Sequence, residues 1–283
     1  MFINRYFVVI LLAANYLFAS EGLNVYLGGQ DGESNYYVNN ASSNFLESKL
    51  IFPIESHIMG LEFQKNVNKY RFNIGFEDQI KDTQETKHGE DFDWKNHIPT
   101  VYSFSNNFIT KNQTFFLESS TDIDLDVINN ITLRISQKKL NFKWTDTEQY
   151  NYTTDTSTLL QGDTLRYSQK IQKIGLSLLS NKESSNLLYK GWINYYDIVS
   201  RDEHIVRNLE TTTHNHGFGY EVELGYKYLI SENASLKALL KYERFKDADT
   251  MSYHLNSTTI TSYPSTMEYK IFSSLLGFEY SFK

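Results

Sequence analysis

The stretch that decides the fold is Tyr70-Arg71-Phe72-Asn73-Ile74-Gly75-Phe76-Glu77. Large apolar side chains occupy every second position, and polar residues or glycine occupy the positions between them. Successive side chains of a β-strand point to opposite faces, so this segment is predicted to form a strand with one apolar and one polar face.

The same alternation recurs along the rest of the chain, at 123–127, 220–228, 236–242 and 278–282. Strands of this kind suit either a soluble β-sandwich or an outer-membrane β-barrel, which is apolar outside and polar inside. Aromatic residues make up 15% of the chain, with 21 Tyr and 19 Phe, and they gather on the apolar faces. Aromatic girdles are typical of membrane barrels, so the pattern favours the barrel.

The composition excludes several classes of protein. The chain has 283 residues, no cysteine and a formal net charge of −7. Without cysteine there is no disulfide scaffold, thiolate metal site or cysteine nucleophile. An acidic balance argues against a nucleic-acid partner, because such proteins usually carry a basic surface.

The first twenty residues resemble a secretory signal. Arg5 gives a positive start, Phe7 to Phe18 is an apolar run, and Ala19-Ser20 provides small residues for cleavage. A membrane anchor is the alternative, but the run is shorter than the roughly 20 residues that a spanning helix needs. We therefore expect 1–20 to be a signal peptide and 21–283 to be one exported barrel domain.

The spacing of turns predicts the number of strands. Four tight turns and five long polar connections join ten antiparallel strands, an even number with short turns at one end and long loops at the other, as bacterial barrels have. Pro53 interrupts the second strand and is interpreted as a bulge. The tight turns are 66–69, 129–130, 181–185 and 231–234, and the long connections are 31–42, 81–110, 143–163, 201–216 and 248–265.

Two of the expected outer loops carry acidic residues two positions apart. These are Asp91-Phe92-Asp93-Trp94 and Arg201-Asp202-Glu203-His204. In an extended chain, residues two apart share a face. Asp202 would then orient His204 as a general base, and a water would fit between the histidine and the other acidic pair. Acids in such loops are more often solvated or bind cations, and the spacing alone leaves that alternative open.

These motifs resemble those of the omptin family of outer-membrane endopeptidases. The family's Asp-x-Asp-Trp is matched by Asp91–Trp94, and its Asp-Glu-His by Asp202–His204. The resemblance implies a ten-stranded transmembrane barrel, with Asp91, Asp93, Asp202 and His204 as catalytic residues at its extracellular rim. It also implies a water nucleophile, no metal and no cofactor, with lipopolysaccharide as the activating lipid. The other expected partners are polypeptide substrates and outer-membrane lipid, the location is the outer membrane, and we expect a monomer.

The resemblance extends less fully to substrate recognition. The family cleaves beside basic residues and holds them in an acidic pocket. One of its acids aligns with Glu33, but Ser200 stands where the second is expected, two residues before Asp202. Since a carboxylate pairs strongly with Arg, both are assigned to substrate binding, with a weaker preference for Arg or Lys.

Other polar groups have simpler interpretations. Asp122, Asp124 and Asp126 are expected to line the lumen, and a metal-binding His214-Asn215-His216 is less favoured than a solvated loop. His88 and His97 are taken as ordinary loop residues, and Lys138-Lys139 is a possible contact for lipid phosphates. A barrel acting as adhesin or surface receptor is the alternative function. A passive pore is disfavoured, because wide channels need about 16 strands.

Overall fold

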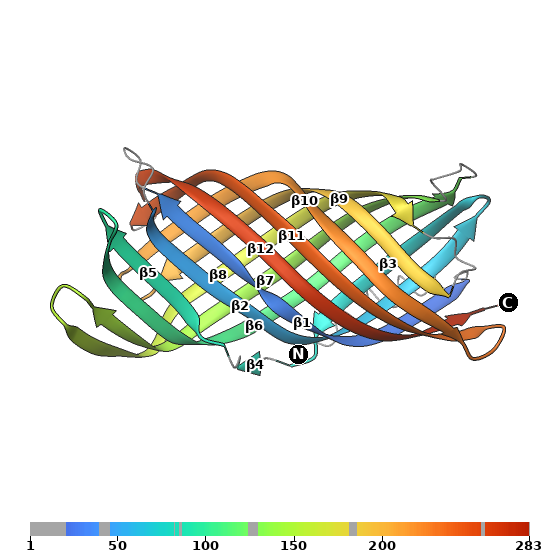
Figure 1. Ribbon diagram of the computed structural model, residues 1–283, viewed down its shortest axis with the longest axis horizontal. Helices are drawn as coiled ribbons and strands as arrows, with labels where there is room; N and C mark the ends of the chain where they lie inside the picture. Colours follow the sequence, from blue (N-terminus) through green and yellow to red (C-terminus); the bar gives the residue numbers. More distant parts are fainter. Residues whose placement is uncertain are drawn as a thin grey trace.

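The computed structural model describes residues 21–39, 46–81, 83–84, 87–123, 130–180, 186–255 and 258–282. It is a closed ring of ten antiparallel strands, tilted relative to the barrel axis (Figure 1). The ring strands are β1 (Gly22–Asn39), β2 (Leu46–Val67), β3 (Tyr70–Gln79), β6 (Ile98–Asp122), β7 (Asn130–Asn151), β8 (Thr156–Ser180), β9 (Leu187–His204), β10 (Leu209–Leu229), β11 (Ala234–Leu255) and β12 (Thr258–Ser281). The predicted all-β, ten-stranded barrel is confirmed, and β1 closes it by pairing with both β2 and β12.

Two further strands lie between β3 and β6. They are β4 (Thr83–Gln84) and β5 (Gly89–Lys95). β3 is short, and above it β5 takes its place in the wall, pairing with β2 on one side and β6 on the other. The hairpin of β5 and β6 projects at the left end in Figure 1. We call this end of the barrel the rim.

The long connections predicted from sequence are wrong in most of their length. β1 continues to Asn39, β7 and β8 are separated only by 152–155, and β9 and β10 only by 205–208. The polar residues there are paired strand residues rather than loop residues. Outside an apolar band nothing requires one face of a strand to be apolar, so the hydrogen-bonded ladder continues while the alternation of side chains is lost.

Pro53 is not a bulge, because β1 and β2 pair without a register shift from Gly22 to Val38. The carbonyl of Pro53 points away from β1 and accepts a hydrogen bond from Asn107 Nδ2 at 3.0 Å. A strand residue's N–H and C=O point to the same side. Proline has no backbone N–H, and at Pro53 this N–H would have pointed to the side of β2 that faces the Asn107 side chain rather than a partner strand. No hydrogen bond between strands is therefore lost.

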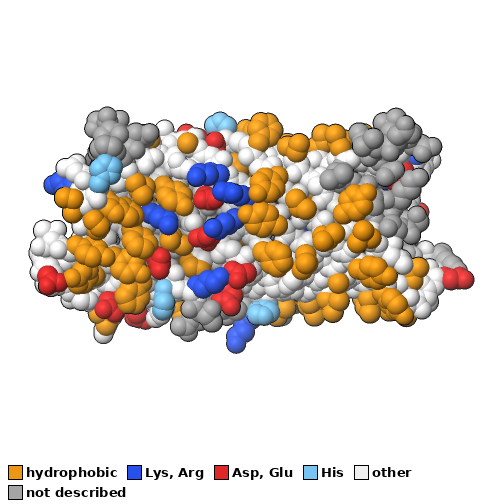
Figure 2. Space-filling view, in the orientation of Figure 1, with side chains coloured by type: hydrophobic (Ala, Val, Ile, Leu, Met, Phe, Trp, Pro, Cys, Tyr) orange, Lys and Arg blue, Asp and Glu red, His pale blue; other side chains and the backbone are white. Residues whose placement is uncertain are grey.

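Exposed apolar side chains form a band around the half of the barrel opposite the rim. Figure 2 shows apolar side chains across the right half of one face, charged side chains left of its centre, and a second apolar group beyond them toward the rim. Tyr195, Phe218 and Tyr220 lie along the rim side of the band, and Tyr70, Tyr228 and Tyr280 lie near its other edge. This is the lipid-facing belt and double aromatic girdle of an outer-membrane barrel. No helix in the described ranges is long and apolar enough to cross a membrane.

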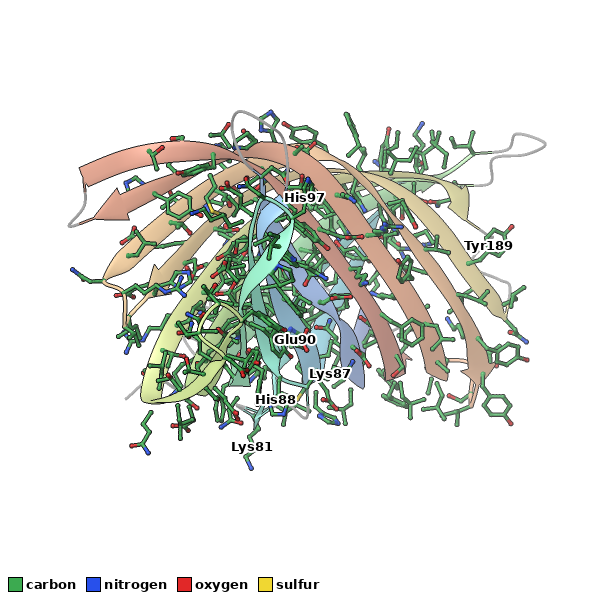
Figure 3. The ribbon with its side chains drawn as sticks, turned by 60° about the vertical axis from the view of Figure 1, so that its left-hand side comes forward. Lys81, Lys87, His88, Glu90, His97 and Tyr189 are labelled. Carbon is green, nitrogen blue, oxygen red and sulfur yellow. The ribbon has the colours of Figure 1, made fainter. Side chains whose placement is uncertain are left out.

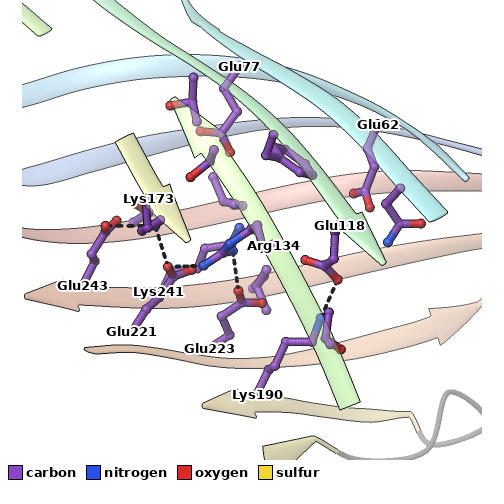
Figure 4. A pocket seen from close by; sticks show the side chains of 18 of the residues that line it. Glu62, Glu77, Glu118, Arg134, Lys173, Lys190, Glu221, Glu223, Lys241 and Glu243 are labelled. Carbon is purple, nitrogen blue, oxygen red and sulfur yellow. Dashed lines mark hydrogen bonds and ion pairs between the residues drawn. The ribbon is translucent and has the colours of Figure 1, made fainter. Parts of the chain in front are cut away.

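The lumen inside this band contains charged side chains in ion pairs (Figure 4). Glu221 contacts both Arg134 and Lys173, which also contacts Glu243 at 2.9 Å. Lys138 faces this lumen and donates to Gln30, so the suggested contact with lipid phosphates on the outer surface does not apply to it. Because burial of unpaired charge is costly, the pairs are what make a polar interior compatible with a folded barrel.

Nearer the rim the interior is apolar and aromatic. The ring of Phe52 stacks on that of Tyr167 with centroids 4.0 Å apart, and on that of Trp144 at 4.8 Å. Tyr36 and Phe142 complete this group, which we call the aromatic floor. It fills the barrel beneath the rim and gives the side chains above it a rigid base.

Candidate active site

Asp202 and His204 are two of the last residues of β9, and both point into the barrel. His204 Nε2 lies 3.0 Å from Oδ2 of Asp202, and the two side chains are 14% and 2% exposed. Tyr36, in the aromatic floor, donates its hydroxyl hydrogen to the same oxygen of Asp202. The same-face prediction for Asp202 and His204 is confirmed, and the carboxylate holds the imidazole from below.

Asp91 lies in β5, opposite Leu50 of β2 and Ser103 of β6. Its side chain is buried, and Ser48 Oγ donates to its Oδ1 at 3.4 Å. Phe92 points to the other side of the strand, where its ring packs on Tyr102 with centroids 4.6 Å apart. This apolar contact on the outer wall keeps Asp91 turned inward, as the alternation of a strand requires.

The two acidic segments meet at the rim. Arg207, in the turn after His204, places Nη2 3.9 Å from Oδ2 of Asp93. Asp91 and His204 are also close enough for the charge of each to shift the pKa of the other. Segments more than 100 residues apart in sequence therefore converge on one site, as the sequence analysis anticipated.

The ionisation of these groups is set by burial and by each other. Burial and then the charge of Asp93 raise the pKa of Asp91 to about 7, against the lowering effects of His204 and Arg207. Burial lowers the pKa of His204, but the charge and hydrogen bond of Asp202 outweigh it and raise that pKa above its ordinary value. Groups that titrate near neutrality are suited to proton transfer.

The arrangement brings a group that can accept a proton and a group that can share one to the same end of the barrel. Above the pKa of His204 the imidazole is neutral and accepts a proton, and the resulting imidazolium is stabilised by Asp202. Near pH 7 the carboxyl of Asp91 retains a proton for part of the time, so it can act as either donor or acceptor. In the parts of the chain that the structure describes, no three His, Asp or Glu side chains form a metal site.

The structure places the two predicted substrate-binding residues differently. Ser200 faces inward and is buried, and Gln169 Nε2 donates to its Oγ at 3.4 Å. Glu33 faces the outer wall, where it pairs with Lys270 and accepts a hydrogen bond from Asn35. The prediction that Glu33 lines an inner substrate pocket is therefore wrong. Its neighbour Ser34 faces inward instead and donates to Gln169 at 2.9 Å.

Several other candidates lie apart from this site. His214 and His216 are strand residues on the outer wall, not a loop, and pair with Asp197 and Asp249. Asp122 accepts a hydrogen bond from Asn130, while positions 124 and 126 lie outside the described residues, as does the expected signal at 1–20.

His88 and His97 belong to the hairpin that carries Asp91 and Asp93. His88 lies near its base, with its ring against Phe104 at 5.6 Å, and His97 lies at its tip (Figure 3). His97 has a positive φ of 67°, which reflects the turn between β5 and β6. Neither residue is among the groups that shift the pKa of Asp91.

Sequence reasoning missed Tyr36, Ser48 and Arg207. Tyr36 comes 166 residues before Asp202, and nothing in its local sequence marks it as a partner. Arg207 follows His204 by three residues in a tight turn, and this closeness in sequence is the one feature that could have identified it as a site residue.

Comparison with known proteins places the fold. No protein-family model and no curated protein matches the sequence. The structure is similar to that of the outer membrane protease OmpT from Escherichia coli, with a TM-score of 0.77 and 15% identity over 92% of this chain and 96% of that one. This similarity establishes an omptin-like barrel fold.

Two other barrels match less well. One is the translocator domain of autotransporter NalP from Neisseria meningitidis, with a TM-score of 0.41 and 10% identity over 99% of this chain and 98% of that one. The other is the outer membrane protein OprG from Pseudomonas aeruginosa, with a TM-score of 0.38 and 9% identity over 93% and 97%.

Proposed function

We propose that the protein is an outer-membrane endopeptidase that hydrolyses peptide bonds with a water activated between Asp91 and His204. The observation that carries this proposal is the inward-facing pair of Asp202 and His204, 3.0 Å apart, at the rim where the acidic hairpin meets the turn at Arg207. The omptin-like fold is consistent with it.

The proposed reaction begins with proton transfer from water to His204. The water oxygen attacks the peptide carbonyl carbon while Asp91 holds the water by a hydrogen bond, and the carbonyl π electrons move to its oxygen. His204 then returns the proton to the leaving amine as the C–N bond breaks, which leaves a carboxyl and an amine. Asp202 stabilises the imidazolium between these two transfers.

We propose a weak preference for basic residues at the cut. The inner site holds the carboxylates of Asp91, Asp93 and Asp202, and this negative charge favours cationic substrates. The side chains beneath them are neutral: Ser200 stands where the second acid was expected, and Ser34 faces inward in place of Glu33, with Gln169 bridging the two serines. A cationic side chain would find no buried carboxylate there for a charge-assisted bond. A peptide-library cleavage profile measures this preference.

The proposed location is the outer membrane with the rim facing outward. The strands extend further beyond the apolar band at the rim than at the opposite end, and in bacterial barrels the longer extramembrane segments face outward. The partners would then be cell-surface polypeptides and the surrounding lipid. Lipopolysaccharide is the proposed activator, and adding it to protein refolded in detergent should raise activity.

The decisive experiment compares wild type with His204→Ala and Asp91→Ala in cleavage of a fluorogenic peptide library. We expect both variants to lose about 100-fold or more in kcat/KM, because each removes a proton-transfer group. His214→Ala is the matched control, since His214 also pairs with an aspartate but lies on the outer wall. Equal cleavage by wild type and His204→Ala would refute the mechanism, and binding without cleavage by wild type would favour an adhesin or receptor.

A further inference from the structure

We propose that Tyr253 is a further catalytic residue, whose hydroxyl donates a hydrogen bond to the oxyanion that forms during peptide hydrolysis. This inference rests on the proposed function and adds the group that would stabilise the transition state. It concerns β11, which contributes none of the four residues identified from sequence.

Strand register places Tyr253 in the same row as Asp202. Asp202 of β9 lies opposite Tyr167 of β8 and opposite Thr211 of β10, and Thr211 lies opposite Tyr253 of β11. Directly opposed residues of paired strands project to the same face of a sheet. Since Asp202 and Thr211 are buried inside the barrel, the Tyr253 side chain also projects inward at the height of the dyad.

The ring of Tyr253 is held in place by its neighbours. It meets the ring of Tyr263 edge to face, with centroids 5.3 Å apart and an interplanar angle of 79°. Both rings pack against the buried cluster that includes the aromatic floor. An edge-to-face pair restrains the ring, so the hydroxyl has a defined position rather than sweeping through the site.

Tyr253 lies within electrostatic reach of the carboxylates of the proposed site. Burial raises the pKa of Tyr253, and the charges of Asp202, Asp93 and Asp91 raise it further. These three acids lie on β9 and β5, and their effect on Tyr253 agrees with the inward direction that the strand register gives its side chain. A phenol whose pKa is raised stays protonated and remains a hydrogen-bond donor throughout the working pH range.

Three other polar side chains at the site already have partners among its acids. Tyr36 already donates to Asp202, Arg207 is directed to Asp93, and Ser48 donates to Asp91. His204 must accept a proton at the moment when the oxyanion forms. Among the residues that the structure describes, none is hydrogen-bonded to the hydroxyl of Tyr253, which leaves it available to the substrate.

The chemistry requires such a donor. When water attacks the carbonyl carbon, the π electrons move to the carbonyl oxygen, which becomes negative beside three acidic side chains. A donated O–H offsets this charge without transferring its proton, and the bond weakens again when the carbonyl re-forms. Loss of one donor of this kind typically costs about 100- to 1,000-fold in kcat.

The test is Tyr253→Phe, with Tyr263→Phe as the matched control. Both substitutions keep the ring and its edge-to-face contact and remove one hydroxyl. We expect Tyr253→Phe to lower kcat by about 100-fold with little change in KM, and Tyr263→Phe to change kcat by less than about threefold. Unchanged kcat in Tyr253→Phe, or equal losses in both variants, would overturn the inference.

A second measurement separates this inference from the proposed function. A peptide phosphinate has tetrahedral oxygens that imitate the oxyanion, and it should bind Tyr253→Phe about 100-fold more weakly than wild type. The uncleaved peptide substrate should bind equally well to the single variant His204→Ala and to the double variant that also carries Tyr253→Phe. Wild type that cleaves, with phosphinate binding unaffected by Tyr253→Phe, refutes the role of Tyr253 alone. Wild type that neither cleaves nor binds the phosphinate refutes both proposals.

Discussion

Arg207 Nη2 lies 3.9 Å from Oδ2 of Asp93, and this contact joins the turn after His204 to the hairpin that carries the acidic pair. The guanidinium does more than connect two segments. Its positive charge lowers the pKa of both Asp91 and His204. Arg207 therefore influences the pH at which the proposed base becomes available.

Replacing Arg207 with Gln should move the acid limb of the pH profile of kcat/KM to higher pH. Without the guanidinium, the pKa of His204 rises, so a larger fraction of the imidazole is protonated and inactive on the acid limb. We expect a loss of about fivefold on the acid limb of the wild-type profile and little loss on its plateau, as suits a partly exposed ion pair. Arg201→Gln is the control, because Arg201 pairs with Glu210 on the outer wall. An identical shift in both variants would exclude this role.

Replacing Tyr36 with Phe should shift the same limb upward by a different route. Tyr36 donates to the Asp202 oxygen that contacts His204, so its removal leaves more negative charge available to the imidazolium. The pKa of His204 then rises, while kcat at high pH stays within about threefold of wild type. Tyr37→Phe is the matched control, since Tyr37 is the next residue and lies on the outer wall near Glu268. NMR titration of the His204 ring provides a direct measurement.

The acid pair should destabilise the barrel at neutral and alkaline pH. The pKa of Asp91 is about 7 in the folded protein and 3.8 in the reference state, so the folded form binds the proton more tightly. Its contribution to stability is fully present below pH 3.8 and is lost as pH rises through 7. Asp91→Asn keeps the shape without the charge. At pH 8 it should increase the free energy of unfolding by on the order of a few kcal/mol and so raise the unfolding temperature. At pH 4 it should change both quantities little.

The Asp91→Asn prediction is checked by thermal unfolding of refolded protein in detergent at both pH values. Asp78→Asn is a suitable control, because Asp78 accepts a hydrogen bond from Gln113 at 2.9 Å on β6 and takes no part in the acidic pair. A gain of equal size at pH 4 and pH 8 would show that the effect does not come from titration of Asp91.

The fold could be predicted because alternation is a local signal in the sequence. Which individual residues face the inside of the barrel could not be predicted with the same accuracy. A shift of one position moves a side chain to the other face of a strand. Glu33 and Ser34 show the consequence, since the sequence resemblance selected Glu33 while the barrel turns Ser34 inward. Asp202 and His204 avoided this problem because their spacing relative to each other, rather than their absolute register, determines that they share a face.

The remaining site residues depend on contacts that the sequence does not encode locally. Tyr36 of β1 contacts Asp202, and Tyr253 of β11 lies in the same row as Asp202. Only the closure of the ring and its register bring those strands to the same height. The extent of the strands was also missed, because beyond the apolar band the ladder is maintained by backbone hydrogen bonds, which leave no side-chain pattern.

The lumenal ion pairs should matter far more to stability than those at the rim. Glu221 is 4% exposed and contacts Arg134 and Lys173, and the guanidinium of Arg134 also lies over the Trp192 ring at 3.9 Å. Glu221→Ala leaves two buried cations without this partner. We expect a loss of about 3 to 5 kcal/mol, seen as a lower unfolding temperature in detergent.

Glu210→Ala is the control for Glu221→Ala, because Glu210 pairs with Arg201 at the exposed rim and should contribute less than about 1 kcal/mol. Equal unfolding temperatures for the two variants would show that the lumenal charges are hydrated well enough to dispense with pairing.

Current across a planar bilayer provides a second measurement. Because the aromatic floor closes the barrel above the ion pairs, Glu221→Ala should conduct no better than wild type. A conducting variant would mean that the charged network, rather than the floor, is what seals the lumen.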